Sequence, residues 1–144
     1  ARVKKEARAA ACRDGTDLLL VDGSPGIGCP VVSSLSGADY VVLVTEPTLS
    51  ALHDLERVRE LLEMFRLRAG CVLNKRDLQP EVAGRLRAVL QQCGMPLLGE
   101  IPYDGRILEA IRQGTTPVEH VADIFEPLFS NILNNILHDS RENS

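Results

Sequence analysis

The sequence predicts an α/β fold, a mostly parallel, doubly wound sheet with flanking helices. Short apolar runs alternate with longer segments of helical periodicity, single Gly and Pro residues separate these segments, and polar residues follow each apolar run directly. This alternation implies right-handed crossovers, and such sheets bind ligands at the carboxyl ends of their strands. The 144 residues match the length of one domain, so we expect a single domain over residues 1–138 and a disordered tail over 139–144.

The first half of the chain contains a helix, two strands and a second, longer helix. Residues 2–12 are rich in Ala, Lys, Arg and Glu, which favour a helix. The apolar run 17–22 predicts a strand, and the β-branched run Tyr40–Thr45 predicts another that is buried on both faces. Thr48 is expected to cap a helix that carries an apolar stripe as far as Phe65.

The second half continues the same alternation. The sequence predicts a strand over 70–73, a helix that opens at Pro80 and a strand over 96–101. Two more helices are expected over 105–113 and 117–138. The last of these has an apolar face and no Lys or Arg on its polar side, so we expect it to pack against protein and not on a membrane.

Composition excludes several classes of protein. Lys and Arg number 16 against 20 Asp and Glu, and the signs are interspersed, which argues against nucleic acid as a partner. The apolar runs are too short to cross a bilayer, and the charged residues 1–13 do not fit a signal peptide, so we expect a cytoplasmic protein. The four cysteines lie far apart in the sequence, which predicts reduced thiols.

The first candidate motif is the segment Asp22–Pro30, with the sequence DGSPGIGCP. A carboxylate at the end of a strand can hold Mg²⁺ beside nucleotide phosphates, and the backbone N–H of Gly26 can approach a phosphate closely. The alternative is two ordinary turns, at D-G and at P-G. The glycine-rich loop with a lysine that normally accompanies such an aspartate is absent from these residues.

The second candidate motif is Asn74–Lys75–Arg76–Asp77, directly after a predicted strand. The Asn74 amide offers both a donor and an acceptor to a nucleotide base, and Asp77 could accept hydrogen bonds from guanine. Alternatively, Asp77 helps to cap the helix that opens at Pro80, or simply turns the chain. Both interpretations of the motif are open at this point.

Several motifs in this order resemble the MinD/Mrp class of P-loop ATPases, most closely its members with an inserted ferredoxin domain, and also the related nitrogenase iron protein. The resemblance covers roughly residues 14–118. It rests on Asp22–Pro30, on the segment from Gly37 to Thr48 with Leu52–Leu55 after it, on Asn74–Asp77, and on Gly99–Asp104.

The resemblance implies ATP and Mg²⁺ as cofactors and a homodimer as the assembly. Asp22 matches the aspartate associated with magnesium, and Gly26 matches the glycine that senses the γ-phosphate. Asn74 matches an adenine contact, and the loop Pro102–Asp104, with Pro102 and Asp104 at its ends, flanks the base. We expect Asp77 to belong to the same nucleotide-binding set.

The chain departs from the family because the amino-terminal loop with two lysines and the cysteine-rich insert are both absent. We therefore expect a carboxy-terminal portion of such an ATPase, P-loop NTPase-like but incomplete and inactive by itself. The resemblance links the parent protein to iron–sulfur or metallocofactor assembly, with an iron–sulfur protein or other metalloprotein as client. The alternatives are a GTPase of the same superfamily and a non-catalytic dimerisation or interaction module.

Cys29 lies seven positions after Asp22, the spacing at which the nitrogenase iron protein carries a ligand of a cluster shared between two subunits. The resemblance therefore implies a possible 4Fe-4S cluster at Cys29. One cysteine in each chain supplies too few thiolates for such a cluster. The alternative is a small buried residue at the start of a helix.

Overall fold

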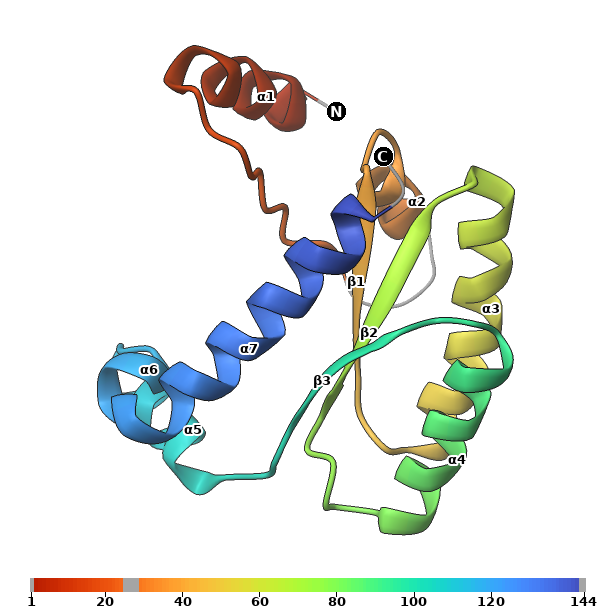
Figure 1. Ribbon diagram of the computed structural model, residues 1–144, viewed down its shortest axis with the longest axis vertical. Coiled ribbons are helices and arrows are strands. Elements are labelled where there is room, and N and C mark those ends of the chain that lie inside the picture. The colour runs from red at the N-terminus through yellow and green to blue at the C-terminus, as the bar shows by residue number, and fades with distance from the viewer. Residues whose placement is uncertain (1, 25–28, 143–144) are drawn as a thin grey trace. The chain divides into compact units, whose positions relative to one another are not determined.

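The computed structural model describes residues 2–24 and 29–142, apart from the side chains of residues 2, 29, 30 and 33 (Figure 1). The chain divides into two compact units, Ala1–Ala38 and Asp39–Ser144. The candidate residues Asp22, Gly26 and Cys29 belong to the first unit. The residues from Asn74 to Asp104 belong to the second.

The first unit begins with helix α1, Arg2–Asp14, which confirms the helix predicted over 2–12. The helix ends where Gly15 adopts a left-handed φ of 64°. The N–H of Thr16 then donates to the carbonyl of Ala11 at 2.9 Å. This is the usual way in which a glycine satisfies the last carbonyls of a helix.

Helix α2, Cys29–Leu35, completes the first unit and is linked to α1 by two side chains. The Lys4 ammonium donates to the carbonyl of Ser34, and the Arg8 guanidinium donates to the carbonyl of Gly37. Among the described side chains of α2, Val31 and Leu35 are the buried apolar ones. Both bonds are charge-assisted, because each donor is a cationic side chain of α1.

The strand predicted over 17–22 is wrong. The described residues of this segment form no ladder, and the described sheet of the chain contains only strands from the second unit. Leu18 is 48% exposed and Leu20 is 84% exposed. A parallel strand exists through its neighbours, which supply its hydrogen bonds and cover its faces, so an apolar run without a paired strand keeps an irregular backbone.

The second unit contains a parallel sheet of three strands in the order β1-β2-β3 (Figure 1). The strands are β1, Tyr40–Thr45, β2, Arg68–Asn74, and β3, Leu97–Ile101. In register, Tyr40 pairs with Arg68 and Asn74 pairs with Ile101. All three strands were predicted, and the α/β class with a parallel sheet and flanking helices is confirmed. The prediction that β1 is buried on both faces is wrong, because none of its residues is fully buried and Val44 is 66% exposed.

The helices of the second unit begin largely where their capping signals predict. They are α3, Leu49–Phe65, α4, Pro80–Gln92, α5, Gly105–Arg112, α6, Pro117–His120, and α7, Ala122–Arg141. The Thr48 hydroxyl accepts the N–H of Ala51 at 3.1 Å and so caps α3, as predicted. The single helix expected over 117–138 is divided, because Val121 has φ −142° and ψ 73° and interrupts the helical backbone.

The two faces of the sheet are covered by different helices. One cluster joins Cys71 and Leu73 of β2 to α3 and α4, and its buried members are Leu55, Cys71, Leu73, Val82, Ala83, Leu86 and Leu90. The other joins Val72 of β2 to β3 and α7, and its buried members are Val72, Leu98, Ile101 and Ile132. Strand β2 is therefore covered on both faces, and α7 packs on the sheet through its apolar face as expected.

The carboxyl end of α7 is attached to the beginning of the sheet. The Tyr40 hydroxyl donates to the Asp139 carboxylate, and the Arg68 guanidinium donates to the backbone carbonyl of Asp139. Arg68 also lies over the Tyr40 ring, 5.7 Å from its centroid. Burial first, and then the bond to Asp139, raises the pKa of the Tyr40 hydroxyl. These contacts hold α7 in helical form as far as Arg141, three residues beyond the expected end at 138.

We predict that Gly70→Ala lowers the free energy of unfolding by about 1–3 kcal/mol, because the neighbouring side chains leave no room for a Cβ at this position of β2. A Cβ at Gly70 would lie 2.6 Å from Leu98 Cδ1. Gly84 in α4 is the matched control, because its Cβ would meet nothing within 4 Å. Gly84→Ala should stabilise the chain by about 0.5–1 kcal/mol. Urea unfolding measures both, and equal effects of the two substitutions would contradict the packing described.

Candidate functional site

Three polar loops follow the three strands of the second unit and meet at one edge of the sheet. The loops are residues 46–48 after β1, 75–79 after β2 and 102–104 after β3. Because the strands are parallel and adjacent, their carboxyl ends lie side by side. The structure therefore brings together the candidates Asn74, Asp77, Pro102 and Asp104.

An ion pair connects the loops that follow β1 and β2. The Lys75 ammonium lies 2.7 Å from the Glu46 carboxylate, and the two side chains are 37% and 40% exposed. Lys75 has a left-handed φ of 52°, which turns the chain sharply at the end of β2. A pair this exposed contributes little stability, but it fixes which groups of the two loops face each other. This pair was not predicted, although its signal is present in the sequence as opposite charges directly after adjacent strands.

Two hydrogen bonds connect the loops that follow β2 and β3. The N–H of Arg76 donates to the carbonyl of Ile101 at 3.1 Å, which continues the strand ladder past the end of the sheet. The N–H of Tyr103 donates to the Asp77 carboxylate at 2.7 Å. The alternative role of Asp77 as the cap of α4 is wrong, because Gln79 is the cap residue of that helix and no side chain bonds there.

The Asn74 side chain is anchored at the start of the same loop. Its carbonyl oxygen accepts the N–H of Lys75 at 3.0 Å, which orients the carboxamide. Asn74 is half-buried, whereas the four strand residues directly before it are buried. A carboxamide has two donor hydrogens and a second lone pair beyond this bond. It can therefore donate to a ligand and accept from it at the edge of the sheet.

Asp104 begins helix α5 and is held by Arg106. Its carboxylate accepts the backbone N–H of Arg106 at 2.9 Å and forms a two-point ion pair with the same guanidinium, at 2.9 and 2.5 Å. The Arg106 guanidinium in turn lies over the Phe125 ring, 5.8 Å from its centroid. Hydrogen bonds from the Arg106 side chain and backbone lower the pKa of Asp104 to about 2. Asp104 is therefore ionised at neutral pH, with its oxygens largely engaged by Arg106.

The candidate site residues of the first unit are Asp22, Gly26 and Cys29. Asp22 is exposed and follows an irregular segment instead of a strand. Gly26 and the side chain of Cys29 lie outside the described residues. The proposed roles of these three residues, magnesium ligand, γ-phosphate sensor and iron–sulfur ligand, therefore stay predictions.

The described part of the chain gives no support for a cluster. Over residues 2–24 and 29–142, no group of three or more His, Cys, Asp or Glu residues could hold a metal ion. Cys12 and Cys93 are exposed, as expected for residues at helix ends. Cys71 is a core residue, as predicted, and burial raises the pKa of its thiol to about 12. A buried thiol with a raised pKa is protonated and unreactive at neutral pH.

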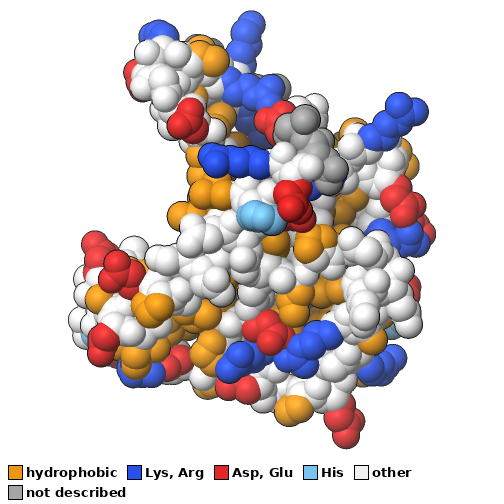
Figure 2. All heavy atoms as spheres, in the orientation of Figure 1, with side chains coloured by type: hydrophobic (Ala, Val, Ile, Leu, Met, Phe, Trp, Pro, Cys, Tyr) orange, Lys and Arg blue, Asp and Glu red, His pale blue; other side chains and the backbone are white. Residues whose placement is uncertain are grey.

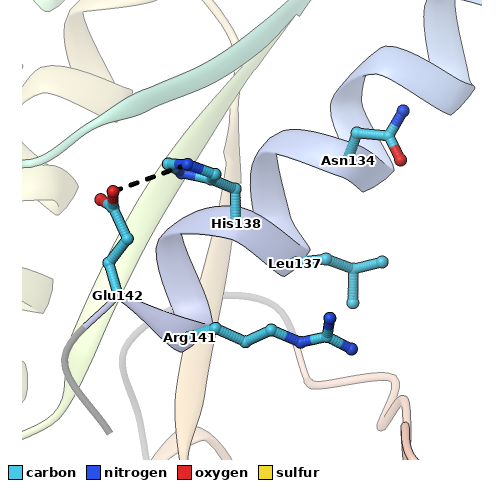
Figure 3. Close-up of a pocket in the computed structure, with 5 residues that line it drawn as sticks. All are labelled: Asn134, Leu137, His138, Arg141 and Glu142. Atoms are coloured by element: carbon cyan, nitrogen blue, oxygen red, sulfur yellow. Dashed lines mark ion pairs between the residues drawn. The ribbon is translucent and has the colours of Figure 1, made fainter.

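A separate hollow lies along the last turns of α7 (Figure 3). It is lined by Asn134, Leu137, His138, Arg141 and Glu142, and His138 Nε2 lies 3.5 Å from Glu142 Oε1. All five residues come from α7 and its end, and none of the predicted site residues lines it. Figure 2 shows acidic and basic side chains interspersed over the second unit. This mixture agrees with the charge pattern of the sequence.

Comparisons with known proteins connect this geometry to a family. No protein-family model matches the chain. An uncharacterized protein of Methanocaldococcus jannaschii is 36% identical over 62 residues, 43% of this chain and 22% of that protein. The chloroplastic septum site-determining minD homolog of Arabidopsis thaliana is 30% identical over 102 residues, 68% of this chain and 31% of that protein. The Pyrococcus furiosus cell division ATPase MinD matches at TM-score 0.70 and 27% identity, over 90% of this chain and 55% of that structure.

Sequence and fold support a place for this chain in the MinD-like P-loop ATPase family. This agrees with the MinD-like part of the resemblance that the order of the motifs indicates. The chain spans about a third of the chloroplastic MinD homolog and about half of the solved MinD. The activity and partners of a whole MinD-like protein are therefore proposals for this chain.

The described helices include none that could cross a membrane, because none is both long enough and apolar enough.

We predict that Arg106→Gln raises the pKa of Asp104 from about 2 toward its ordinary value of 3.8, because the guanidinium is the main cause of the depression. The folded pKa lies below the ordinary one, so this carboxylate stabilises the fold above pH about 4, and the contribution is lost as the pH falls toward 2. A carboxyl-carbon NMR titration measures the pKa. Arg112→Gln, which affects the pairing of Glu109, is the control. An unchanged Asp104 titration in Arg106→Gln would contradict the geometry.

Proposed function

We propose that this chain is the carboxy-terminal portion of a MinD-like ATP-binding protein, and that it holds the adenine base of the nucleotide at the carboxyl edge of its sheet. Asn74 and the loop Pro102–Asp104 would contact the base. The observation that supports this proposal is the connection of all three strand loops by Glu46–Lys75 and Asp77–Tyr103. A site connected in this way meets a ligand without first having to order its loops.

The chemistry of the exposed groups fits a purine base. The Asn74 carboxamide can donate to a ring nitrogen of adenine and accept from its exocyclic amine. Tyr103, in the loop after β3, is 58% exposed and offers an aromatic face to a base. Asp104, already paired with Arg106, would shape the loop and would not itself accept from the nucleotide.

The resemblance implies roles for two further residues, Asp22 and Gly26. Within the proposal, Asp22 would hold Mg²⁺, usually through water, and Gly26 would present its backbone N–H to the γ-phosphate. Bound Mg²⁺ would neutralise charge on the phosphates. Phosphoryl transfer depends mainly on positioning and charge stabilisation, and the sequence of this chain has no glycine-rich lysine loop, so we propose that the chain alone does not turn over ATP.

Two further parts of the proposal, the homodimer and the iron–sulfur link, rest on the resemblance to the family. The working assembly would be a cytoplasmic homodimer with ATP bound between its subunits. The link to iron–sulfur or metallocofactor assembly comes from the resemblance, with Cys29 as the possible cluster ligand, and the described cysteines add no ligand to it.

We predict that the chain binds ATP in preference to GTP, and that Asn74→Ala weakens ATP binding about tenfold, because one or two hydrogen bonds to the base would be lost. Titration calorimetry with each nucleotide and Mg²⁺ measures the affinities. Asn134→Ala, on α7 and outside this edge of the sheet, is the matched control and should bind as the unchanged chain does.

The same proposal requires that saturating ATP raise the melting temperature, since a ligand that binds only the native state must stabilise it. An unchanged melting temperature at millimolar ATP would contradict it and would favour a non-catalytic interaction module. Equal or tighter binding of GTP would favour a GTPase.

A further inference from the structure

Asp77 occupies the position from which an N-K-x-D motif could read a guanine base, but its carboxylate already has a partner within the chain. The N–H of Tyr103 donates to Asp77 Oδ1 at 2.7 Å, across 26 residues of sequence. The bond connects the loop after β2 to the loop after β3. The two ends of the bond are exposed, so it exists without the support of a surrounding core.

The bond takes the place of a ladder bond between neighbouring strands. Residues Asn74 and Ile101 are paired in the sheet, and one bond further along, the N–H of Arg76 donates to the carbonyl of Ile101. In a continuing parallel ladder, the next N–H of the β3 chain would donate to a backbone carbonyl of the β2 chain. Here the Asp77 carboxylate accepts that N–H instead. The side chain therefore extends the pairing of the two chains into the loops.

Recognition of guanine would require both oxygens of this carboxylate. Guanine presents two donors on one edge, its ring N–H and its exocyclic amine, and a carboxylate reads them by accepting one with each oxygen. Asp77 Oδ1 already uses one of its two lone pairs to accept the N–H of Tyr103, and this bond turns the carboxylate toward the neighbouring loop. Adenine has no ring N–H on that edge, so a site for adenine has no need of a free carboxylate there.

We infer that Asp77 is a positioning residue, which holds the loop Pro102–Asp104 against the end of β2, and that it does not contact the base. This inference rests on the proposed function, because the loop it holds is the one proposed to flank adenine. Base preference then follows from the Asn74 carboxamide and the loop. At position 77, any side-chain acceptor that reaches the N–H of Tyr103 is sufficient to hold the loop.

Two substitutions at this position separate positioning from base contact. Asp77→Asn keeps an oxygen that can accept the N–H of Tyr103, but changes the group that would read guanine, since an amide donates where a carboxylate accepts. Asp77→Ala removes the acceptor. Glu81→Ala, an exposed carboxylate in the first turn of α4, is the matched control.

The first measurement is amide hydrogen exchange at Tyr103 in the full chain, followed by NMR. We expect exchange to be at least tenfold faster in Asp77→Ala, and within about twofold of the original rate in Asp77→Asn and Glu81→Ala. Unchanged exchange in Asp77→Ala would overturn the inference. This measurement needs no ligand, so it decides the positioning role even if the chain binds no nucleotide and the proposed function fails.

The second measurement is the affinity of each variant for ATP, GTP and xanthosine triphosphate. We expect Asp77→Ala to weaken ATP binding at least fivefold, and Asp77→Asn to restore it with the order of preference unchanged. Xanthine carries an acceptor where guanine carries the exocyclic amine. A shift of preference from GTP to xanthosine triphosphate in Asp77→Asn would therefore show that position 77 reads the base, and would overturn the inference.

Discussion

The burial of strand β2 is the constraint on which the second unit depends. Cys71, Val72 and Leu73 are all less than 5% exposed, because β1 and β3 pair with both edges of the strand while α3 and α4 cover one face and α7 covers the other. A strand held in this way has one register and one direction. The residues that follow it leave the core at a fixed point. Asn74, Lys75, Arg76 and Asp77 are these residues, and each makes a contact that orients a neighbouring loop or its own.

The same constraint explains how a polar site can form with few buried polar groups. The described side chains include none that is both polar and buried. The Glu46–Lys75 pair and the Asp77–Tyr103 bond lie at the surface, where each alone contributes little. They act on loops whose starting points the sheet has already fixed. A weak contact then suffices to select one loop arrangement, and the loops meet a ligand in that arrangement.

Much of the fold could be predicted from the sequence, because its signals are local. Thr48 before an apolar stripe and Pro80 at the first helical position mark helix starts by their own hydrogen-bonding and backbone preferences. The apolar run over 17–22 carried an equally strong local signal and formed no strand. Its outcome depends on a paired neighbour, which the composition of the run does not determine. The division at Val121 and the extension of α7 to Arg141 likewise depend on tertiary contacts, the latter with Tyr40 and Arg68.

The location of the candidate site could be predicted from the sequence, but the contacts within it could not. The rule that ligands bind at the carboxyl ends of parallel strands identified Asn74 and the loop Pro102–Asp104, and the structure places both at that edge. The partners of Asp77 and Asp104 could not be read from the motif. The Tyr103 N–H is a backbone group without a sequence signature, and pairing of Arg106 with Asp104 depends on the geometry at the start of α5.

The proposed function requires that the three connected loops form one surface for a nucleotide base. The most direct test is a map of amide chemical-shift changes in the ¹⁵N-labelled chain on titration with Mg–ATP. We expect the largest shift changes within the second unit to fall together in residues 46–48, 74–77 and 102–104, and all of them to report the same affinity for Mg–ATP. Changes centred elsewhere in that unit, for example along α7, or different affinities for the three loops, would contradict it.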